Sequence, residues 1–316
     1  MRVKTTTSWL TASAALLATA VMVGPMSAAP ASAAAAAAPV THRTIFATKA
    51  GALHRLTLSP TGAVIARTPV AGGGAGAVAS DYNGSRLVFV RPGDRQSWLD
   101  DRVWLREPTG ASRLLAAGRL ATLSPGGTGA TITRYVTGGR EPGSVDPRHD
   151  EHSVYRIADG HVFPLPFHED GYIDRRIRNS HDGTSRWMLV RKPGSGPATT
   201  TLMRYDGATG TTAKVLHSGE YDDCHDMEIL PSGANALLAC HTKLMTIRLA
   251  DGAILHRTPF PNGTNAETLD GRLNPTTMLL SMQSPTGRWL AALDVTTMRT
   301  RTLPGTAGYT NGVAAY

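Results

Sequence analysis

The chain has 316 residues and a formal net charge of +8, with 32 Lys and Arg residues against 24 Asp and Glu residues. The basic residues are scattered along the sequence, and only 6% of all residues are aromatic. A nucleic-acid groove needs a basic stripe with aromatic stacking platforms. We therefore expect no nucleic-acid partner for this protein.

The N-terminus has the order of an export signal. Arg2 and Lys4 precede an apolar run from Trp9 to Val23, and small residues follow up to Ala31-Ser32-Ala33. This pattern predicts a Sec-type signal peptide over residues 1–33, cleaved near Ala33. The apolar run is short for a membrane span, and Gly24-Pro25 ends it. We therefore expect a secreted, extracellular protein with no transmembrane anchor after cleavage.

An Ala-rich linker is expected over residues 34–42, and one folded unit over residues 43–316. Within this unit, turn-forming segments recur in two interleaved series. The first series comprises Ser59–Gly62, Glu107–Gly110, Ala158–Gly160, Asp206–Gly210, Ala250–Gly252 and Val295–Thr297. The second comprises Asp81–Gly84, Ser124–Gly127, Ser180–Gly183, Pro231–Gly233 and Asp270–Pro275. The spacing is roughly 43–51 residues, which is the length of a four-stranded propeller blade.

Around each turn, apolar and polar residues alternate, which predicts antiparallel hairpins. Outer hairpins are expected over Leu53–Pro69, Val103–Ala116, Val154–Leu165, Leu202–Leu216, Leu244–Thr258 and Trp289–Leu303. Inner hairpins are expected over Ala77–Val90, Leu120–Val136, Ile173–Val190, Cys224–Cys240 and Glu267–Met282. The second strand of each inner hairpin is strongly apolar, as expected for burial on both faces between blades.

The two ends of the folded unit complement each other. It begins with a lone strand, Thr44–Ala47, and ends with Asn311–Tyr316, which looks like a first strand without its partner. The sequence therefore predicts an all-β fold: a six-bladed β-propeller of four-stranded blades, closed by pairing the N-terminal strand with the C-terminal strand. A seventh blade would need strands within 137–152, whose Gly, Pro and charged residues disfavour them.

The turns Ser124–Gly127 and Ser180–Gly183, each followed by a Leu- or Trp-rich strand, resemble the PD40/WD40-like repeats of TolB-like six-bladed propellers. Four or five of the inner hairpins match this pattern. The family includes non-catalytic protein-binding propellers, peptidase-associated propellers and polysaccharide lyases. The resemblance therefore implies a fold and leaves the activity open.

Two cysteines, Cys224 and Cys240, lie almost symmetrically about the turn Pro231–Gly233. If this turn closes a hairpin, the two residues face each other on neighbouring strands. Because an exported protein folds in an oxidising compartment, we expect a disulfide between them. A thiol nucleophile or a metal ligand is the alternative.

In a propeller, the connections between blades and those between the second and third strands of each blade gather on one face, around the channel mouth. Here this mouth face receives three long connections, 91–102, 137–152 and 191–199. It also receives four polar segments, 167–175, 217–226, 262–267 and 305–311. Binding residues are often carried on such loops above a rigid scaffold.

The polar residues at the start of the inner strands are the candidate ligand-binding groups. They are His168, Asp174, Arg175, Tyr221, Asp223, His225, Asp226, Asn265, Glu267 and Asn311. Side chains at these positions are expected to ring the channel mouth and to form a small polar pocket for a cation, a sugar or a peptide end. The alternative is that they cap strand ends and bind water in a wet channel.

Four of these and nearby residues have suitable metal-ligating groups: His168, Asp174, His225 and His241. Imidazole with carboxylate suits several divalent cations. However, no spacing matches a zinc or an EF-hand calcium motif. We therefore expect that no cofactor is required, although a divalent cation is compatible with these groups. The cluster 148–152 is expected to lie in a solvated loop.

The sequence contains no Gly-x-Ser-x-Gly nucleophile elbow. An enzyme would have to use groups at the channel mouth, with His225 as base, Arg175 or Arg176 as anion clamp, and Tyr221 or Tyr309 as acid. That arrangement would suit a lyase or hydrolase acting on an acidic polysaccharide. The favoured interpretation is a monomeric, non-catalytic binding or scaffold module whose partner is a protein or a cell-wall or extracellular glycan.

Overall fold

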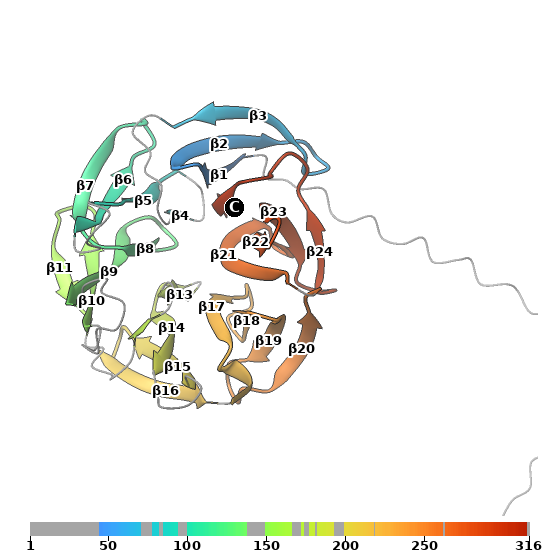
Figure 1. The fold of residues 1–316 in the computed structure, drawn as a ribbon. Helices are drawn as coiled ribbons and strands as arrows, with labels where there is room; N and C mark the ends of the chain where they lie inside the picture. The colour runs from blue at the N-terminus through green and yellow to red at the C-terminus, as the bar shows by residue number, and fades with distance from the viewer. Residues whose placement is uncertain are drawn as a thin grey trace, which may run out of the picture. The chain divides into compact units, whose positions relative to one another are not determined.

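The computed structural model describes residues 44–70, 78–81, 85–93, 100–137, 149–165, 172–173, 177–180, 182–192, 199–217, 219–261 and 263–314. These residues form six four-stranded antiparallel blades around a central channel (Figure 1), which confirms the predicted all-β propeller. A short 3-10 turn, η2 (Gly219–Tyr221), precedes the fifth blade. The predicted signal peptide and linker lie outside the described residues.

We number the blades in chain order and give their strands from the channel outward. Blade 1 contains β25 (Thr310–Ala314), β1 (Thr44–Lys49), β2 (Ala52–Leu58) and β3 (Val64–Pro69), and blade 2 contains β4 (Val78–Ser80), β5 (Leu87–Arg91), β6 (Arg102–Arg106) and β7 (Ser112–Ala117). Blade 3 contains β8 (Leu120–Leu123), β9 (Gly129–Thr137), β10 (His149–Arg156) and β11 (Val162–Pro164). Blade 4 has a split inner strand, β12 (Tyr172–Ile173) and β13 (Arg178–Asn179), followed by β14 (Ser185–Lys192), β15 (Thr199–Asp206) and β16 (Thr211–His217).

The remaining two blades complete the ring. Blade 5 contains β17 (Cys224–Ile229), β18 (Asn235–Cys240), β19 (Lys243–Arg248) and β20 (Ile254–Pro259). Blade 6 contains β21 (Asn265–Asn274), β22 (Thr277–Ser284), β23 (Gly287–Asp294) and β24 (Arg299–Thr302). The hairpins predicted from the alternation of apolar and polar residues therefore appear in the expected order.

The C-terminal strand closes the ring as predicted. β25 pairs antiparallel with β1, with Phe46 opposite Val313. β25 also forms one parallel bridge to the inner strand of blade 6, between Gly271 and Ala314. Blades 6 and 1 are therefore joined into one eight-stranded sheet where the ring closes.

Two turns of the second series, at Ser124 and Ser180, share one geometry. Ser124 Oγ accepts a hydrogen bond from the backbone N of Gly129 at 3.0 Å, and Ser180 Oγ accepts one from the backbone N of Ser185 at 2.9 Å. Gly127 closes the first of these turns with φ = 66°. Residues with a side chain adopt this backbone conformation only at a cost in free energy, whereas glycine adopts it readily. The Ser and Gly of these two segments thus make the same tight turn in blades 3 and 4. The turn predicted over Asp270–Pro275 begins later than expected, because β21 continues through Asn274 and β22 starts at Thr277.

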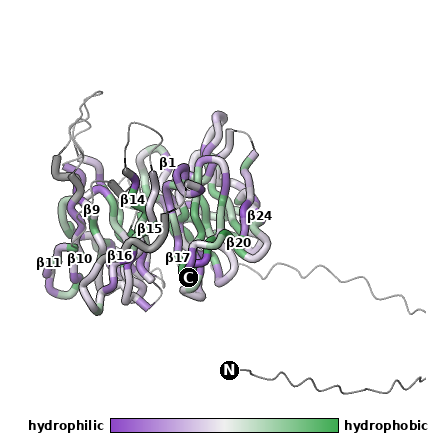
Figure 2. The backbone as a smooth tube through the Cα atoms, turned by 90° about the horizontal axis from the view of Figure 1, so that it is seen from below, coloured by the Kyte–Doolittle hydropathy of each residue, from purple (hydrophilic) through white to green (hydrophobic). Residues whose placement is uncertain are grey.

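The hydrophobic core is divided among the blade interfaces. In the described residues, six apolar clusters each join two neighbouring blades. On β18, Leu238 and Cys240 face the cluster shared with blade 4, whereas Leu237 and Ala239 face the cluster shared with blade 6. Figure 2 shows hydrophobic residues along the strands between β17 and β20 and more hydrophilic residues toward the ends of the blades. The second strands are therefore buried on both faces, as predicted.

One predicted loop is shorter than expected. β10 begins at His149, so residues 149–152 continue a strand paired with β9 and are not part of a loop. His152 is buried, and its Nδ1 lies 3.0 Å from Thr133 Oγ1 on the neighbouring strand. The prediction of a solvated loop over these residues was therefore wrong, because pairing with β9 makes this polar stretch a strand. Glu151, which points the other way, is exposed.

The described residues form no helix that is long and apolar enough to cross a membrane.

Candidate binding pocket at the channel mouth

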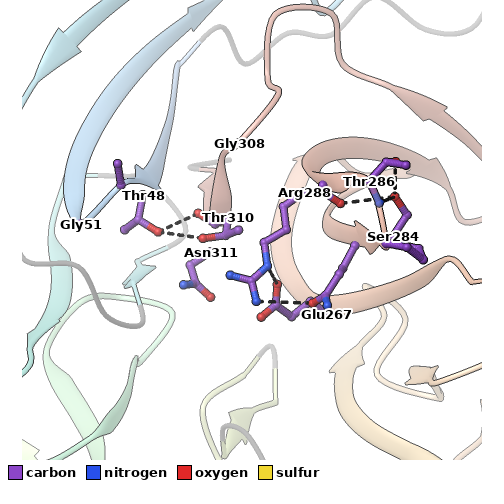
Figure 3. A pocket seen from close by; sticks show the side chains of 13 residues that line it. Thr48, Gly51, Glu267, Ser284, Thr286, Arg288, Gly308, Thr310 and Asn311 are labelled. Carbon is purple, nitrogen blue, oxygen red and sulfur yellow. Dashed lines mark hydrogen bonds and ion pairs between the residues drawn. The ribbon is translucent and has the colours of Figure 1, made fainter. Parts of the chain in front are cut away.

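A pocket of about 600 Å³ opens on the mouth face where blades 6 and 1 meet. We call it the seam pocket (Figure 3). It is lined by the β1–β2 turn, by residues 283–288 around the β22–β23 turn, by Glu267 near the start of β21, and by residues of the segment 308–311 that enters β25. Its walls therefore come from both sides of the junction that closes the ring.

Two tight turns form part of the pocket rim. β1 and β2 are joined by Ala50 and Gly51, which have φ values of 47° and 82°. β22 and β23 are joined by Pro285 and Thr286, and Gly287 follows with φ = 149°. Two-residue turns fix the register of their hairpins. The rim is therefore held by short connections rather than by long loops.

Thr48 and Thr310 join β1 to β25 at the edge of the pocket. Thr48 Oγ1 donates to the carbonyl oxygen of Thr310 at 3.0 Å and lies 3.1 Å from Thr310 Oγ1. Thr48 is buried, whereas Thr310 is partly exposed to the pocket. These contacts hold the strand that carries Asn311 against the N-terminal strand, as Figure 3 shows.

The charged groups of the pocket are Arg288 and Glu267, both from blade 6. Arg288 Nε lies 3.4 Å from Glu267 Oε2, and Arg288 Nη2 donates to Gln283 Oε1 at 3.5 Å. The Arg288 side chain is half exposed, whereas that of Glu267 is largely covered. An arginine carries five N–H donors. The guanidinium thus keeps hydrogen-bonding capacity for a ligand after its contacts with Glu267 and Gln283.

Asn311 adopts a backbone conformation that is uncommon for a residue with a side chain. Its φ is 48°, and it lies where the pairing of β25 with β1 is irregular. Asparagine tolerates this left-handed region better than most residues, and such conformations concentrate at functional sites. Its side-chain amide makes no hydrogen bond with another described residue, and it lines the pocket.

Among the ligand-binding candidates from the sequence, the structure places Glu267 and Asn311 in the pocket. Asn265 lies two residues before Glu267 on β21 and pairs with the pocket residue Gln283 in the β21–β22 ladder. His168, Asp174 and Arg175 lie outside the described residues. The metal and catalytic interpretations that depend on these three residues stay predictions.

His225, the candidate general base, lies between blades 5 and 6. It is 4% exposed, and its Nε2 lies 2.9 Å from the carbonyl oxygen of Ala266, to which it donates. Its ring stacks on that of His241 with the centroids 4.8 Å apart. The contact with Ala266 fixes the ring between two blades, which is a structural use of this histidine.

Asp226 belongs to a buried ion network along the channel. It is 1% exposed and binds Arg178 of blade 4, with Arg178 Nη2 donating to both carboxylate oxygens at 3.1 and 3.0 Å. Arg178 Nη1 lies 3.1 Å from Glu228 Oε2, and Nη2 also donates to the carbonyl oxygen of Leu269 in blade 6 at 2.6 Å. Burial alone lowers the pKa of the Arg178 guanidinium, but the facing carboxylates of Asp226 and Glu228 outweigh it, so the pKa is raised. Arg178 therefore stays charged and ties three blades together.

The two candidate acids, Tyr221 and Tyr309, are both buried. The Tyr221 hydroxyl donates to the carbonyl oxygen of Gly252 at 2.9 Å, and burial, followed by the nearby charge of Asp251, raises the pKa of this phenol. The Tyr309 ring packs edge-on against His54, with the ring centroids 5.6 Å apart. Both rings thus serve the packing of their blades.

Cys224 and Cys240 form the predicted disulfide across the β17–β18 ladder. Asp223 carries the third ligand-type group beside them. Because the two sulfurs are bonded to each other, they are not available as thiolates for a metal or for nucleophilic attack. Asp223 instead lies 3.4 Å from Lys243 Nζ and accepts a hydrogen bond from Thr242.

Sequence reasoning did not single out Arg288, Gln283 or Thr48. All three lie next to two-residue turns on the mouth face. Long connections and polar clusters are the sequence signals of a ligand site on this face, and these turns are short and carry neither. The available signal was Pro285-Thr286-Gly287, a tight turn that topology places on the same face as the start of β21.

No protein-family model matches this sequence, and no curated protein is similar to it. The fold is similar to that of several solved structures. The crystal structure of TolB from Acinetobacter baumannii matches with a TM-score of 0.65 and 13% identity over 88% of this chain and 67% of that chain. One chain of a nidogen/laminin complex matches with a TM-score of 0.62 and 8% identity over 86% of this chain and 98% of that chain. A putative TolB from Agrobacterium tumefaciens matches with a TM-score of 0.57 and 11% identity over 87% and 97% of the two chains. At these identities the likeness is one of fold: a TolB-like propeller.

Proposed function

We propose that the protein is an exported binding module that holds an extracellular ligand, a protein or a glycan, at the mouth face of its propeller. The observation that carries this proposal is the seam pocket. It brings an accessible guanidinium and an amide without a protein partner in the described residues, Arg288 and Asn311, to one polar cavity. Cavities of roughly 300–1,000 Å³ with a few convergent polar groups are typical ligand sites.

The proposed export rests on the N-terminal signal pattern and agrees with the chemistry of the cysteines. Residues 1–33 have the charge, apolar run and small-residue site of a cleaved signal. The two cysteines of the chain form a disulfide, which persists in oxidising compartments. Mass determination of the protein secreted by cells that express the full chain tests this point, because cleavage near Ala33 removes a defined mass.

A binding role suits the described residues better than the lyase or hydrolase alternative. The candidate base His225 donates to a backbone carbonyl between two blades, and the candidate acid Tyr221 donates to another. Neither of these lines the seam pocket. The described candidates for acid and base are thus engaged in structural contacts, whereas the pocket carries groups suited to hold a ligand.

Thermal unfolding of the secreted protein tests the proposal. The probes are neutral and acidic oligosaccharides, short peptides, and divalent metal chlorides with and without chelator. A probe that binds the folded state raises its stability by about 2.7 kcal/mol at a hundredfold excess over Kd. We expect Arg288→Gln to abolish the shift and Arg299→Gln, which removes the same charge from the exposed strand β24, to preserve it. A shift that survives Arg288→Gln, or no shift with any probe, contradicts the proposal.

A further inference from the structure

The lining of the seam pocket is polar and balanced in charge. Glu267 and Arg288 supply one negative and one positive group, and Gln283 and Asn311 supply amides. None of the described residues that line the pocket is aromatic, and Pro285 is its bulkiest apolar group. Protein partners typically anchor themselves with aromatic or large apolar side chains in desolvated pockets. This lining offers such an anchor little surface to pack against.

Glu267 gives the pocket a hydrogen-bond acceptor. Its Oε2 is buried and lies 3.4 Å from Arg288 Nε, so this atom is already covered. The other carboxylate oxygen, Oε1, accepts no hydrogen bond from the described residues, and Glu267 lines the pocket. An ionised carboxylate only accepts hydrogen bonds. A ligand that donates a hydrogen bond therefore suits this part of the pocket.

Hydrogen-bond donors lie next to this carboxylate. Arg288 presents N–H groups beyond its contacts with Glu267 and Gln283, and Asn311 presents an amide. Figure 3 shows Arg288 and Glu267 meeting beside Asn311. A ligand that binds all three groups must donate and accept at neighbouring atoms. A hydroxyl does both, whereas a carboxylate accepts only and an ammonium donates only. A ligand carboxylate would in addition be repelled by Glu267.

We propose that the seam pocket binds a neutral polyhydroxyl ligand, the sugar units of a short glycan. One hydroxyl donates to Glu267, and a neighbouring hydroxyl accepts from Arg288 and Asn311. This inference rests on the proposed function and names the ligand class of the same site. The cavity of about 600 Å³ lies in the size range of small-molecule sites, which suits a short oligosaccharide.

Calorimetric titration of the secreted protein tests the ligand class. The probes are the neutral disaccharides maltose, cellobiose and lactose, the acidic disaccharide digalacturonate, and an acidic hexapeptide. We expect at least one neutral disaccharide to bind, and digalacturonate and the peptide to bind at least tenfold more weakly. A hydrogen bond to a charged group changes Kd by roughly tenfold or more. Glu267→Gln should therefore raise the Kd of the neutral sugar by about that factor.

Asn311→Gly is the second variant. It removes the amide but keeps the left-handed backbone, which glycine adopts without strain. We expect a loss of affinity of roughly three- to tenfold, as for a neutral hydrogen bond. Arg299→Gln on β24 is the control and should bind the sugar as the unmodified protein does. Equal melting temperatures without sugar show that the variants remain folded.

Monodeoxy derivatives of the best sugar then locate the hydroxyl that donates to Glu267. Its removal should weaken binding to the unmodified protein and leave binding to Glu267→Gln nearly unchanged, because the partner is already altered. Removal of other hydroxyls should weaken binding to both proteins alike. If no deoxy position shows this coupling, the assignment of Glu267 as the acceptor is wrong.

The outcomes separate the inference from the proposed function. If digalacturonate or the acidic peptide binds more tightly than every neutral sugar and depends on Arg288, the ligand class is wrong and the pocket still serves binding. If neutral sugars bind and neither Glu267→Gln nor Asn311→Gly raises their Kd, the sugar site lies elsewhere. If no probe binds in a manner that depends on Arg288, both proposals fail.

Discussion

At the scale of single residues, the inner strands bury charge where a propeller channel would be expected to hold water and loosely placed polar groups. Arg178 on β13 reaches Asp226 and Glu228 on β17 and the Leu269 carbonyl oxygen on β21. Arg272 on β21 donates to the carbonyl oxygen of Ile229 on β17. These contacts cross blade boundaries, so the polar interior joins the blades as the apolar clusters do.

Replacing Arg178 should therefore be far more costly than replacing an exposed arginine. Arg178→Met removes the cation that faces the carboxylates of Asp226 and Glu228, and breaking a buried ion pair costs about 3–5 kcal/mol. Arg248→Met is the matched control, because Arg248 pairs with Asp251 at 2.7 Å with both side chains about half exposed. It should leave the free energy of unfolding nearly unchanged, because water screens an exposed ion pair. Urea unfolding measures both values, and similar costs for the two variants would contradict the structural role of Arg178.

At the scale of elements, the cross-strand disulfide joins the two inner strands of blade 5 near the mouth face. Both sulfurs are buried in the cluster shared with blade 4. The loop it closes has a sequence separation of 16 residues. A disulfide stabilises mainly by restricting the unfolded chain, and a loop of this length corresponds to about 3 kcal/mol.

The double variant Cys224→Ala/Cys240→Ala should therefore lose about 3 kcal/mol of unfolding free energy. In reductant, the unmodified protein should lose stability toward the level of the variant, whose own stability should not respond to reductant. Urea unfolding with and without reductant separates the bond from the packing of the two side chains. An unchanged midpoint of the unmodified protein in reductant, with the cysteines shown to be reduced, would show that the bond adds no stability.

The elements were predictable from the sequence because their signals are local. The Ser124 and Ser180 turns and the apolar strand of β18 follow from turn chemistry and from burial on both faces. The position of β10 was not predictable in this way, because pairing with β9 gives order to a polar stretch such as His149–His152. Local composition carries no information about which partner strand is present.

The candidate site was predictable only in part. Glu267 and Asn311 follow from topology, since inner strands begin at the mouth. Arg288 and Gln283 were missed because their contact with Glu267 depends on the fold of one short turn over the start of another strand. His225 carries the residue type of a base, but its contact with the Ala266 carbonyl is a tertiary feature. The type of a residue alone therefore does not show whether its side chain binds a ligand or holds two blades together.

At the scale of the whole molecule, the seam pocket lies at the junction of blades 6 and 1, where the ring closes. Its walls come from β1, from β25 and from blade 6, so the pocket is complete only while β25 stays paired between them. A ligand in the pocket binds the closed ring and not the open one. It must therefore stabilise closure by mass action.

A variant that displaces β25 tests this coupling. A Cβ built on Gly312 would come within 2.9 Å of Leu279 and 3.0 Å of Leu290, which pack behind β25. Gly312→Val should therefore push the strand away from blade 6 and speed amide exchange in β1 and β25, while β18 stays protected.

The matched control is Gly126→Ala, because no atom lies within 4 Å of a Cβ at that turn. It should leave exchange in β1 unchanged. A ligand that binds the seam pocket should slow exchange in β1 and β25 of the unmodified protein, and it should bind Gly312→Val more weakly. If Gly312→Val speeds amide exchange equally in all blades, the ring unfolds as one unit. Closure is then not a separate step, and ligand binding cannot be coupled to it.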